Sequence, residues 1–356
     1  MKDFFKKEKP LQGISGWGGG ATGLRMAGGA SPYIEATGGT KTTPGDGYVY
    51  HYMTGGTFAV ENAGVGPDGI IDICLVGGGG GGGNDLGGGG GGGGFRITTV
   101  DIATLGAGNY PCSVGNGGPD GGSSGPNNSR PRAQNGDPSY FTLTPTTRIE
   151  VGGGGGGGGQ NGAGGDPVVP NTEYGYPGTP YPHPTASTPH PNTTVYPGSG
   201  GGAKSNRGPG GAGAGPTFNS YPGNKGRNYE DAGIKRGGGG GGAGGGGPVT
   251  STSGNGGVGA QLPWALPTWG WGQNDDSHTP GGYGWFAGGG GGGSDPAEFC
   301  PNPREGKSGG GRGSCPTSPY GNGAPGTGGG GGAKGPGGAG GGHGGSGAIM
   351  IRYPAA

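Results

Sequence analysis

Two aspartates and a histidine form the densest group of residues that could do chemistry: Asp275, Asp276 and His278. Carboxylates and an imidazole at this spacing can bind a metal ion or serve as the acid and base of a glycosidase. The four other histidines lie far apart in loop-like sequence and supply no second base. We therefore expect a solvated loop at 275–278, with no metal and no catalytic residue.

The four cysteines lack the spacing of a zinc or redox site, because no Cys-x-x-Cys pair occurs among them. Cys300 and Cys315 flank a loop and could form a disulfide under oxidising conditions, with free thiols as the alternative. Gly-x-Gly-x-x-Gly matches are frequent, but no strand and helix surround them, so they predict no nucleotide site. We expect a protein that needs no cofactor and is not an enzyme.

Aromatic side chains that could bind a partner occur in three loop-like segments, 160–199, 217–236 and 261–287. Tyr and Trp beside Pro, Ser, Gly and Asn offer a large contact area with few rotatable bonds, as in binding loops. We expect them to bind a protein or carbohydrate surface; the alternative is that they cover the glycine-rich body. The candidates are Tyr174, Tyr176, Tyr181, Tyr196, Tyr221, Tyr229, Trp264, Trp269, Trp271, Tyr283 and Trp285.

Residues 1–46 predict an extended arm, because their apolar side chains are spread among Gly and Lys without a steady period. We expect this arm to dock onto a larger assembly and anchor the protein there. A disordered tail, or a tail packed on its own body, is the alternative. The anchoring candidates are Phe4, Phe5, Leu11, Ile14 and Trp17.

Charges balance along the chain, with 21 basic and 21 acidic residues. No overall field therefore favours nucleic acid or an anionic membrane as a partner. No apolar stretch approaches the ~20 residues that a transmembrane helix needs. We expect neither nucleic-acid binding nor membrane insertion.

Short segments rich in β-branched and aromatic residues predict strands between residues 47 and 151, and one more near the C-terminal end. The segments 48–52 and 57–60 flank a Thr-Gly-Gly turn signal and predict a hairpin. The last strand, 348–353, is closest in type to 70–76 and is expected to close onto the N-terminal sheet. No helix of any length is predicted.

Glycine dominates the rest of the sequence: 113 of 356 residues are Gly, with unbroken runs such as 87–94 and 152–159. Collagen is excluded because its Gly-X-Y register is absent. A flexible linker is disfavoured, since Ser does not dominate between the runs and strand-like segments occur at both ends. The hydrophobic share of 26% limits a conventional core to part of the chain.

The junctions between strands and glycine runs predict how the runs are ordered. Val76 leads directly into Gly77, and Val151 into Gly152; β-strands and polyproline-II helices are neighbours in φ/ψ space. We expect the runs to continue the strands as polyglycine-II helices that hydrogen-bond laterally, with no inward Cβ to obstruct them. Ala243 and Ala333 are expected on outer helices, with their methyl groups facing solvent.

The predicted fold is a sandwich-like all-β module continuous with a polyglycine-II helix bundle, essentially without α-helix. We divide the chain into an anchoring arm at 1–46, a β-rich module at 47–151, and a glycine-rich body with aromatic loops at 152–347. The strand at 348–353 is expected to close the module.

Two motifs resemble the glycine-rich domains of bacteriophage tail-fibre and other virion proteins. These are Ile73-Cys-Leu-Val-Gly77 leading into polyglycine, and the ending Gly347-Ala-Ile-Met-Ile-Arg-Tyr-Pro354. Residues 57–354 are similar to the distal adhesins of T-even-like phages that infect Salmonella. The resemblance implies a polyglycine-II sandwich whose distal loops bind a host-surface protein or glycan, and it carries over no catalytic residue.

From this resemblance we expect a structural virion protein, a tail-fibre tip or adhesin on the tail or capsid exterior, held by other virion proteins through its arm. A capsid-surface fibre or decoration protein is the alternative. An ice-binding polyproline-II protein is an alternative from another class, which the bulky and irregular loops disfavour. Whether the chain forms a homo-oligomer, such as a trimer, stays open.

Overall fold

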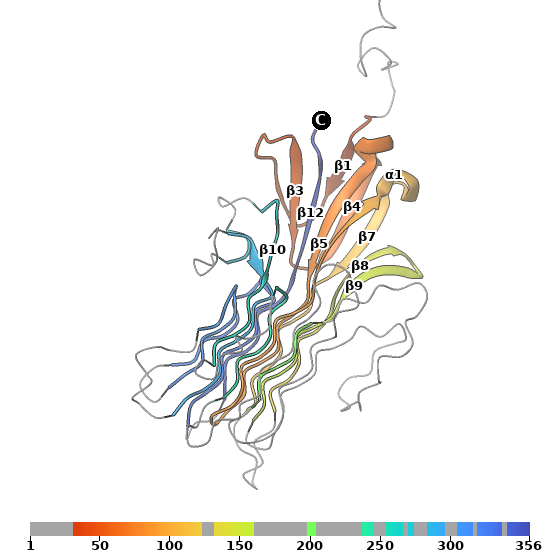
Figure 1. Ribbon diagram of the computed structural model, residues 1–356. Coiled ribbons are helices and arrows are strands. Elements are labelled where there is room, and N and C mark those ends of the chain that lie inside the picture. Colours follow the sequence, from red (N-terminus) through yellow and green to blue (C-terminus); the bar gives the residue numbers. More distant parts are fainter. Residues whose placement is uncertain are drawn as a thin grey trace, which may run out of the picture.

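The computed structural model describes residues 31–122, 132–159, 198–203, 237–244, 254–265, 270–273, 283–295, 305–315, 319–336 and 340–356. They form a β-module at one end and a body of extended glycine-rich segments at the other (Figure 1). This part of the chain is nearly all β, as predicted, and its only helices are the 3-10 helix η3 (Gly66–Gly69) and the single turn α1 (Ile102–Leu105). No helix in the described ranges is long and apolar enough to cross a membrane.

One five-stranded sheet has the spatial order β1-β4-β7-β8-β9, and every neighbouring pair is antiparallel. Its strands alternate buried and exposed side chains, as expected for a sheet with one face in a core. They are β1 (Ile34–Thr37), β4 (Gly56–Ala63), β7 (Gly108–Ser113), β8 (Ser139–Thr144) and β9 (Thr147–Val151).

The second sheet has the spatial order β2-β3-β12-β5-β6 and is also antiparallel. Its C-terminal strand lies in the middle, with Ala348 opposite Val76 on one side and Ile349 opposite Met53 on the other. The end of the chain is thereby held between two strands from its first quarter. The strands are β2 (Thr40–Thr42), β3 (Tyr48–Met53), β12 (Ala348–Pro354), β5 (Ile70–Val76) and β6 (Phe95–Asp101).

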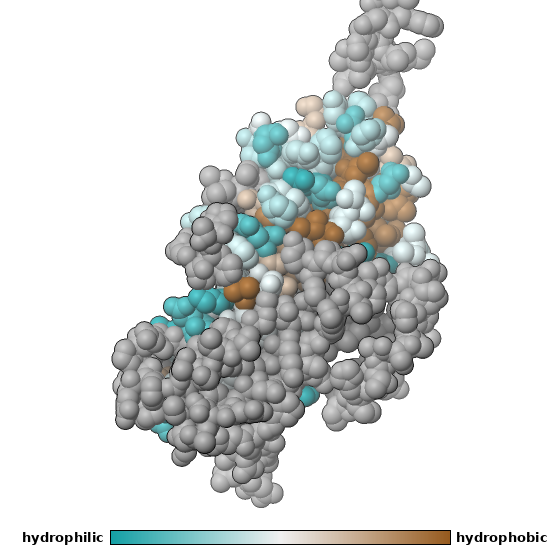
Figure 2. All heavy atoms as spheres, in the orientation of Figure 1, coloured by the Kyte–Doolittle hydropathy of each residue, from teal (hydrophilic) through white to brown (hydrophobic). Residues whose placement is uncertain are grey.

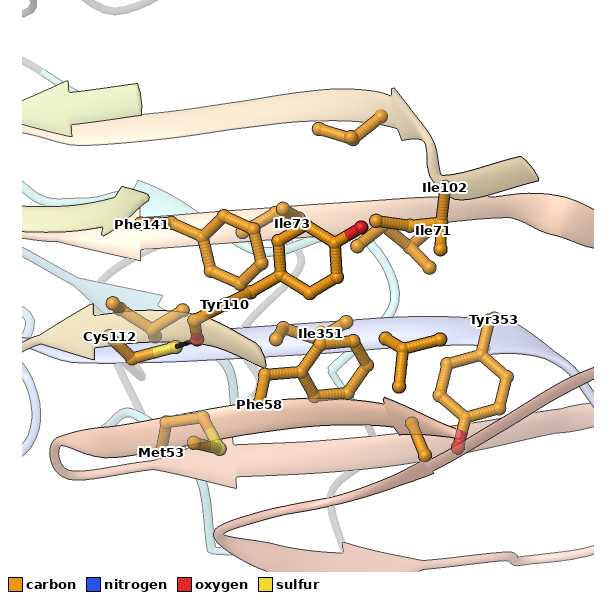
Figure 3. Packing of buried hydrophobic residues seen from close by; sticks show 14 of the residues in the cluster. Met53, Phe58, Ile71, Ile73, Ile102, Tyr110, Cys112, Phe141, Ile351 and Tyr353 are labelled. Carbon is orange, nitrogen blue, oxygen red and sulfur yellow. Dashed lines mark hydrogen bonds between the residues drawn. The ribbon is translucent and has the colours of Figure 1, made fainter. Parts of the chain in front are cut away.

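The hydrophobic core lies between the inner faces of these two sheets. Figure 3 shows Phe58, Tyr110 and Phe141 of the first sheet packed against Ile73 and Ile351 of the second. The rings of Tyr110 and Phe141 stack with their centroids 5.9 Å apart. Fully burying one such side chain contributes about 1.5–3 kcal/mol, so the module has a conventional core that the glycine-rich body lacks.

The predicted hairpin of 48–52 and 57–60 is wrong. These segments are consecutive strands, but β3 pairs with β2 and β12, whereas β4 pairs with β1 and β7. The turn between them carries the chain from one sheet to the other. Whether the two strands form a hairpin in one sheet or lie in two facing sheets, their apolar faces contact the same core. The local sequence therefore does not distinguish a hairpin from a crossing between sheets.

The predicted boundaries of the arm, module and body also differ from the structure. β1 and β2 lie within the segment 1–46 that was assigned to the arm, so the module begins by residue 34. The glycine runs 77–83 and 87–94 lie within 47–151 but belong to the body, where they hydrogen-bond to other glycine-rich segments. The body is therefore built from excursions between the module's strands: the runs 77–83 and 152–159 continue β5 and β9 out of the sandwich, and the run 87–94 leads back into β6.

The segment 77–83 shows how the glycine runs are ordered. The amides of Gly77, Gly80 and Gly83 donate to one neighbour, the segment 87–94, each at an N···O distance of 2.9 Å. The amides between them donate in the same threefold alternation to segments 132–138 and 340–347. A period of three is that of the polyglycine-II helix.

The carbonyl groups of this helix accept hydrogen bonds from three further segments, 115–122, 152–159 and 328–335. Six helices therefore surround it, and every amide and carbonyl from Gly78 to Gly83 has a partner. The helix at 87–94 is likewise bonded to six neighbours. Lateral bonding thus satisfies backbone groups that an isolated polyglycine-II helix would leave to water.

The two helices with six neighbours each leave no room for a side chain at their glycine positions. A methyl group at Gly80 would overlap the carbonyl oxygen of Gly155, and one at Gly91 would overlap that of Ser199. Ala243 and Ala333 are only 3% and 0% exposed, so the expectation that their methyl groups face solvent is wrong. The Ala243 methyl is covered by an apolar cluster at the boundary between body and module.

Candidate functional site

The end of the body opposite the module, which we call the tip, is formed where polyglycine-II helices reverse direction. The helix at 77–83 leaves the module from β5, and the helix at 87–94 returns to it as β6 (Figure 1). The reversal between them is the turn 84–86. Any connection at the tip is therefore held away from the module by the length of the helices, about 25 Å for eight residues.

Three residues close this turn. Asp85 and Leu86 have φ angles of 47° and 61°, which side-chain-bearing residues seldom adopt. The Leu86 amide donates to the Lys334 carbonyl at 2.9 Å. The buried Asn84 side chain donates from Nδ2 to the carbonyl of Gly122 at 2.9 Å, so the turn ties three helix ends together.

Longer connections also leave the body at the tip. Ala203 ends one helix and Gly237 begins the next, and the amide of Gly238 donates to the Ala203 carbonyl at 2.8 Å. The two ends of segment 204–236 are therefore adjacent. The segment itself, which includes Tyr221 and Tyr229, lies outside the described residues.

Most of the predicted contact residues lie outside the described residues, so their role stays a prediction. Among the loop candidates these are Tyr174, Tyr176, Tyr181, Tyr196, Tyr221, Tyr229 and Trp269. The anchoring candidates Phe4, Phe5, Leu11, Ile14 and Trp17 lie outside as well, as do Asp275, Asp276, His278 and Cys300. The structure places Trp264, Trp271, Tyr283 and Trp285.

Trp264 and Trp271 lie against the module and not at the tip. Each is only 8% exposed. The Trp264 ring centroid is 6.1 Å from that of Tyr50, and the Trp271 centroid is 5.3 Å from that of Tyr52. Both side chains cover the outer face of β3, whereas the alternative expectation had them cover the glycine-rich body. The contact with a partner that we expect of them stays a prediction.

A small two-stranded sheet fixes the loop that carries these tryptophans. β10 (Ala260–Gln261) pairs with β11 (Trp285–Phe286), and the Gln273 amide donates to the Trp285 carbonyl at 2.9 Å. Leu262 and Phe286 join the same buried cluster. Leu262, Trp264, Trp271 and Phe286 thus pack on the second sheet at the boundary between module and body.

Arg352 links this loop to the sheet beneath it. Its guanidinium carbon lies 4.7 Å from the ring centroid of Tyr48 and 5.1 Å from that of Trp264. Its Nε donates to Asp72 Oδ2 at 2.9 Å. Stacking on two rings and a carboxylate contact together fix the Trp264 side chain in place.

Two further candidates are less enclosed. Tyr283 is 42% exposed and Trp285 is partly buried. Tyr283 can therefore contact a partner, but it lies beside β11, next to the module, and not at the tip. No observation assigns it a ligand.

The titratable groups of the module take part in packing. Buried His51 contacts the Gly38 carbonyl through Nδ1 at 2.7 Å and the Tyr353 hydroxyl through Nε2 at 3.0 Å, and burial lowers the pKa of its imidazole. Burial raises the pKa of the free thiols Cys74 and Cys112, that of Cys112 to about 12.

Cys315 is disulfide-bonded. The described ranges contain no group of three or more His, Cys, Asp or Glu side chains that could hold a metal ion.

Sequence reasoning did not single out three exposed apolar residues at the far end of the module, Val65, Ile70 and Leu105. Nothing in their local pattern distinguishes them from buried strand residues.

Comparison with known proteins places the chain in a family. The model of a glycine-rich domain matches residues 53–262, from the last residue of β3 to the beginning of the tryptophan loop. No curated protein sequence matches the chain. Because the matched region spans more than half of its residues, the chain belongs to the glycine-rich domain family.

Proposed function

We propose that this protein is a structural component of a bacteriophage virion, a tail-fibre tip or adhesin that presents loops to a host-surface protein or glycan. The observation that carries the proposal is the polarity of the molecule. Residue 31 and the C-terminus lie at the module end, whereas the turn 84–86 and both ends of segment 204–236 lie at the tip. An anchor at one end and loops at the other suit a presenting role.

The body between these ends supports the proposal because it is stiff. Its inner helices are bonded to six neighbours each, and bending any one of them would stretch hydrogen bonds in several directions. Loops at the tip can vary in length and composition without disturbing the lattice, since they begin after the last residue of a helix that hydrogen-bonds to its neighbours, such as Ala203. Binding residues on loops carried by a rigid scaffold are a common arrangement.

The test is a loop replacement at the tip. Segment 204–236 is exchanged for the three-residue turn Asn-Asp-Leu copied from 84–86, which the adjacency of Ala203 and Gly238 permits. We expect virions that carry this variant to lose adsorption to the host, while the purified protein keeps its thermal unfolding midpoint. Unchanged adsorption, after the same exchange at segment 123–131 as well, would refute the adhesin role.

The control for this test is Thr57→Ala, which changes an exposed residue of β4 in the module, away from the tip, and should leave adsorption unchanged. Deletion of 261–287 cannot serve as the loop test, because it would remove Trp264 and Trp271 from the cluster that covers β3 and would destabilise the fold. Antibody labelling of virions then distinguishes the two phage roles: label on the tail supports the adhesin, and label spread over the capsid supports a decoration protein.

A further inference from the structure

Three large apolar side chains are exposed at the apex of the module, the end opposite the tip. Val65 is 59% exposed, Ile70 37% and Leu105 38%; we call them the apical patch. Val65 precedes η3, Ile70 begins β5 and Leu105 ends α1. Figure 2 shows apolar side chains gathered on the module beside α1.

The chain brings these three residues together through the contact between η3 and α1. Ile70 lies opposite Asp101, the residue that precedes α1. At Gly69, the last residue of η3, an added Cβ would lie 2.5 Å from the Ala103 Cβ, so the two turns are in direct contact. The three residues are therefore carried by turns that contact each other.

The apical patch is bordered by carboxylates. Asp68 lies in η3, and the exposed Asp101 directly precedes α1. Asp101 accepts hydrogen bonds from the Thr104 amide at 3.1 Å and the Thr104 hydroxyl at 2.7 Å, and these bonds lower its pKa. An occupant of the patch must be apolar at its centre and basic at its edge.

The N-terminal part of the chain joins the module at this patch. The Val65 amide donates to the Pro32 carbonyl at 2.9 Å, and Asn62 donates from Nδ2 to the carbonyls of Ser31 and Tyr33 at 2.6 and 2.8 Å. Residue 31 is thereby fixed beside Val65. Whatever precedes it is tethered within a short distance of the apical patch.

Residues 1–17 have the chemistry that the patch requires. They include four lysines against two acidic residues, together with the five apolar anchoring candidates. The glycine-rich segment 18–30 separates them from the module, and the root-mean-square end-to-end distance of a Gly-rich linker of 13 residues is roughly 20 Å. This reach covers the patch. The apolar residues are Phe4, Phe5, Leu11, Ile14 and Trp17.

We infer that the apical patch is the docking surface for residues 1–17 of the same chain, with their apolar side chains on Val65, Ile70 and Leu105 and their lysines facing Asp68 and Asp101. A tether of this length gives an effective concentration of about a millimolar. A second copy at micromolar concentration competes poorly with it. The inference goes beyond the proposed virion role and does not depend on it, and it implies that an assembly partner must displace the segment to reach the patch.

The test is photo-crosslinking of the full chain with p-benzoylphenylalanine in place of Phe5. After irradiation, mass spectrometry is expected to find cross-links to peptides that contain Val65, Ile70 or Leu105. Mixing ¹⁵N-labelled and unlabelled protein identifies the source: cross-links within one isotope label support docking in the same chain. Mixed-label cross-links, cross-links elsewhere, or none would overturn the inference.

A matched pair of substitutions tests the apolar contact. Leu105→Glu should lower the cross-link yield at least about tenfold, since it removes the leucine that docking would bury and adds a carboxylate. Tyr283→Glu, of similar exposure but outside the patch, should leave the yield unchanged. Equal yields in both would overturn the inference, and Val65→Glu repeats the test if Leu105→Glu lowers the melting temperature.

Discussion

A single methyl group in the lattice of polyglycine-II helices tests why this protein uses uninterrupted glycine. We consider Gly80→Ala, at the centre of the helix 77–83. The added Cβ would overlap the Gly155 carbonyl oxygen and lie 2.5 Å from the Gly155 carbonyl carbon. These atoms belong to the backbone of a neighbouring helix and cannot rotate away, so one helix must move.

The expected cost follows from that displacement. Overpacking costs about 1–3 kcal/mol. The Gly80 amide also bonds to the Gly91 carbonyl at 2.9 Å, and leaving such a buried group unpaired costs about 1–3 kcal/mol. Ala restricts the unfolded chain more than Gly does, which offsets about 0.4–1 kcal/mol. We expect Gly80→Ala to lower the free energy of unfolding by about 1–5 kcal/mol.

The measurement is denaturant unfolding of Gly80→Ala beside a matched control, Gly108→Ala. Gly108 begins β7, its φ is not in the left-handed region, and a Cβ there would have no neighbour within 4 Å. The control should be neutral or stabilising by up to about 1 kcal/mol. If the two variants unfold at the same denaturant concentration, the close packing that we describe for the glycine helices is refuted.

Three further outcomes are expected. Burial lowers the pKa of the His51 imidazole, so the unfolded chain binds the proton more readily than the folded chain. The free energy of unfolding should therefore be highest above pH ~6.5 and fall as the pH drops below that value. Melting curves recorded at several pH values should show a weaker pH dependence for His51→Gln. Trp264→Ala and Trp271→Ala should each lower the free energy of unfolding by about 3–5 kcal/mol, whereas Tyr283→Ala should change it by about 0.5 kcal/mol or less. Cys74 and Cys112, both buried with raised pKa values, should react with a thiol reagent only after unfolding; rapid labelling of the native protein would contradict their burial.

The ordering of the glycine runs could be predicted from the sequence because it depends on local geometry. Val76 passes into Gly77 without a turn, and the structure shows threefold lateral bonding from that residue onward. Glycine is required wherever a Cβ would meet a neighbouring carbonyl, which is a property of the helix itself. The all-β class of the module was predictable for the same reason, since alternation within a strand is also local.

Other features depend on partners that are distant in sequence. Tyr48–Met53 could pair within a hairpin or cross to another sheet, and its actual neighbour, Ala348–Pro354, is some three hundred residues away. Trp264 and Trp271 have the composition of a binding loop, but their rings lie on Tyr50 and Tyr52 of that same strand. Only the tertiary fold distinguishes an aromatic residue that covers a sheet from one that contacts a ligand.

Amide hydrogen exchange over residues 77–94 tests the central claim most directly, that laterally bonded polyglycine-II helices form a rigid body. We predict that the amides of both helices are protected about as strongly as those of β5 and β12, because their carbonyl partners lie in neighbouring helices and opening requires the lattice to separate. Exchange of these amides at the rate of an unstructured peptide, while β5 stays protected, would contradict the account.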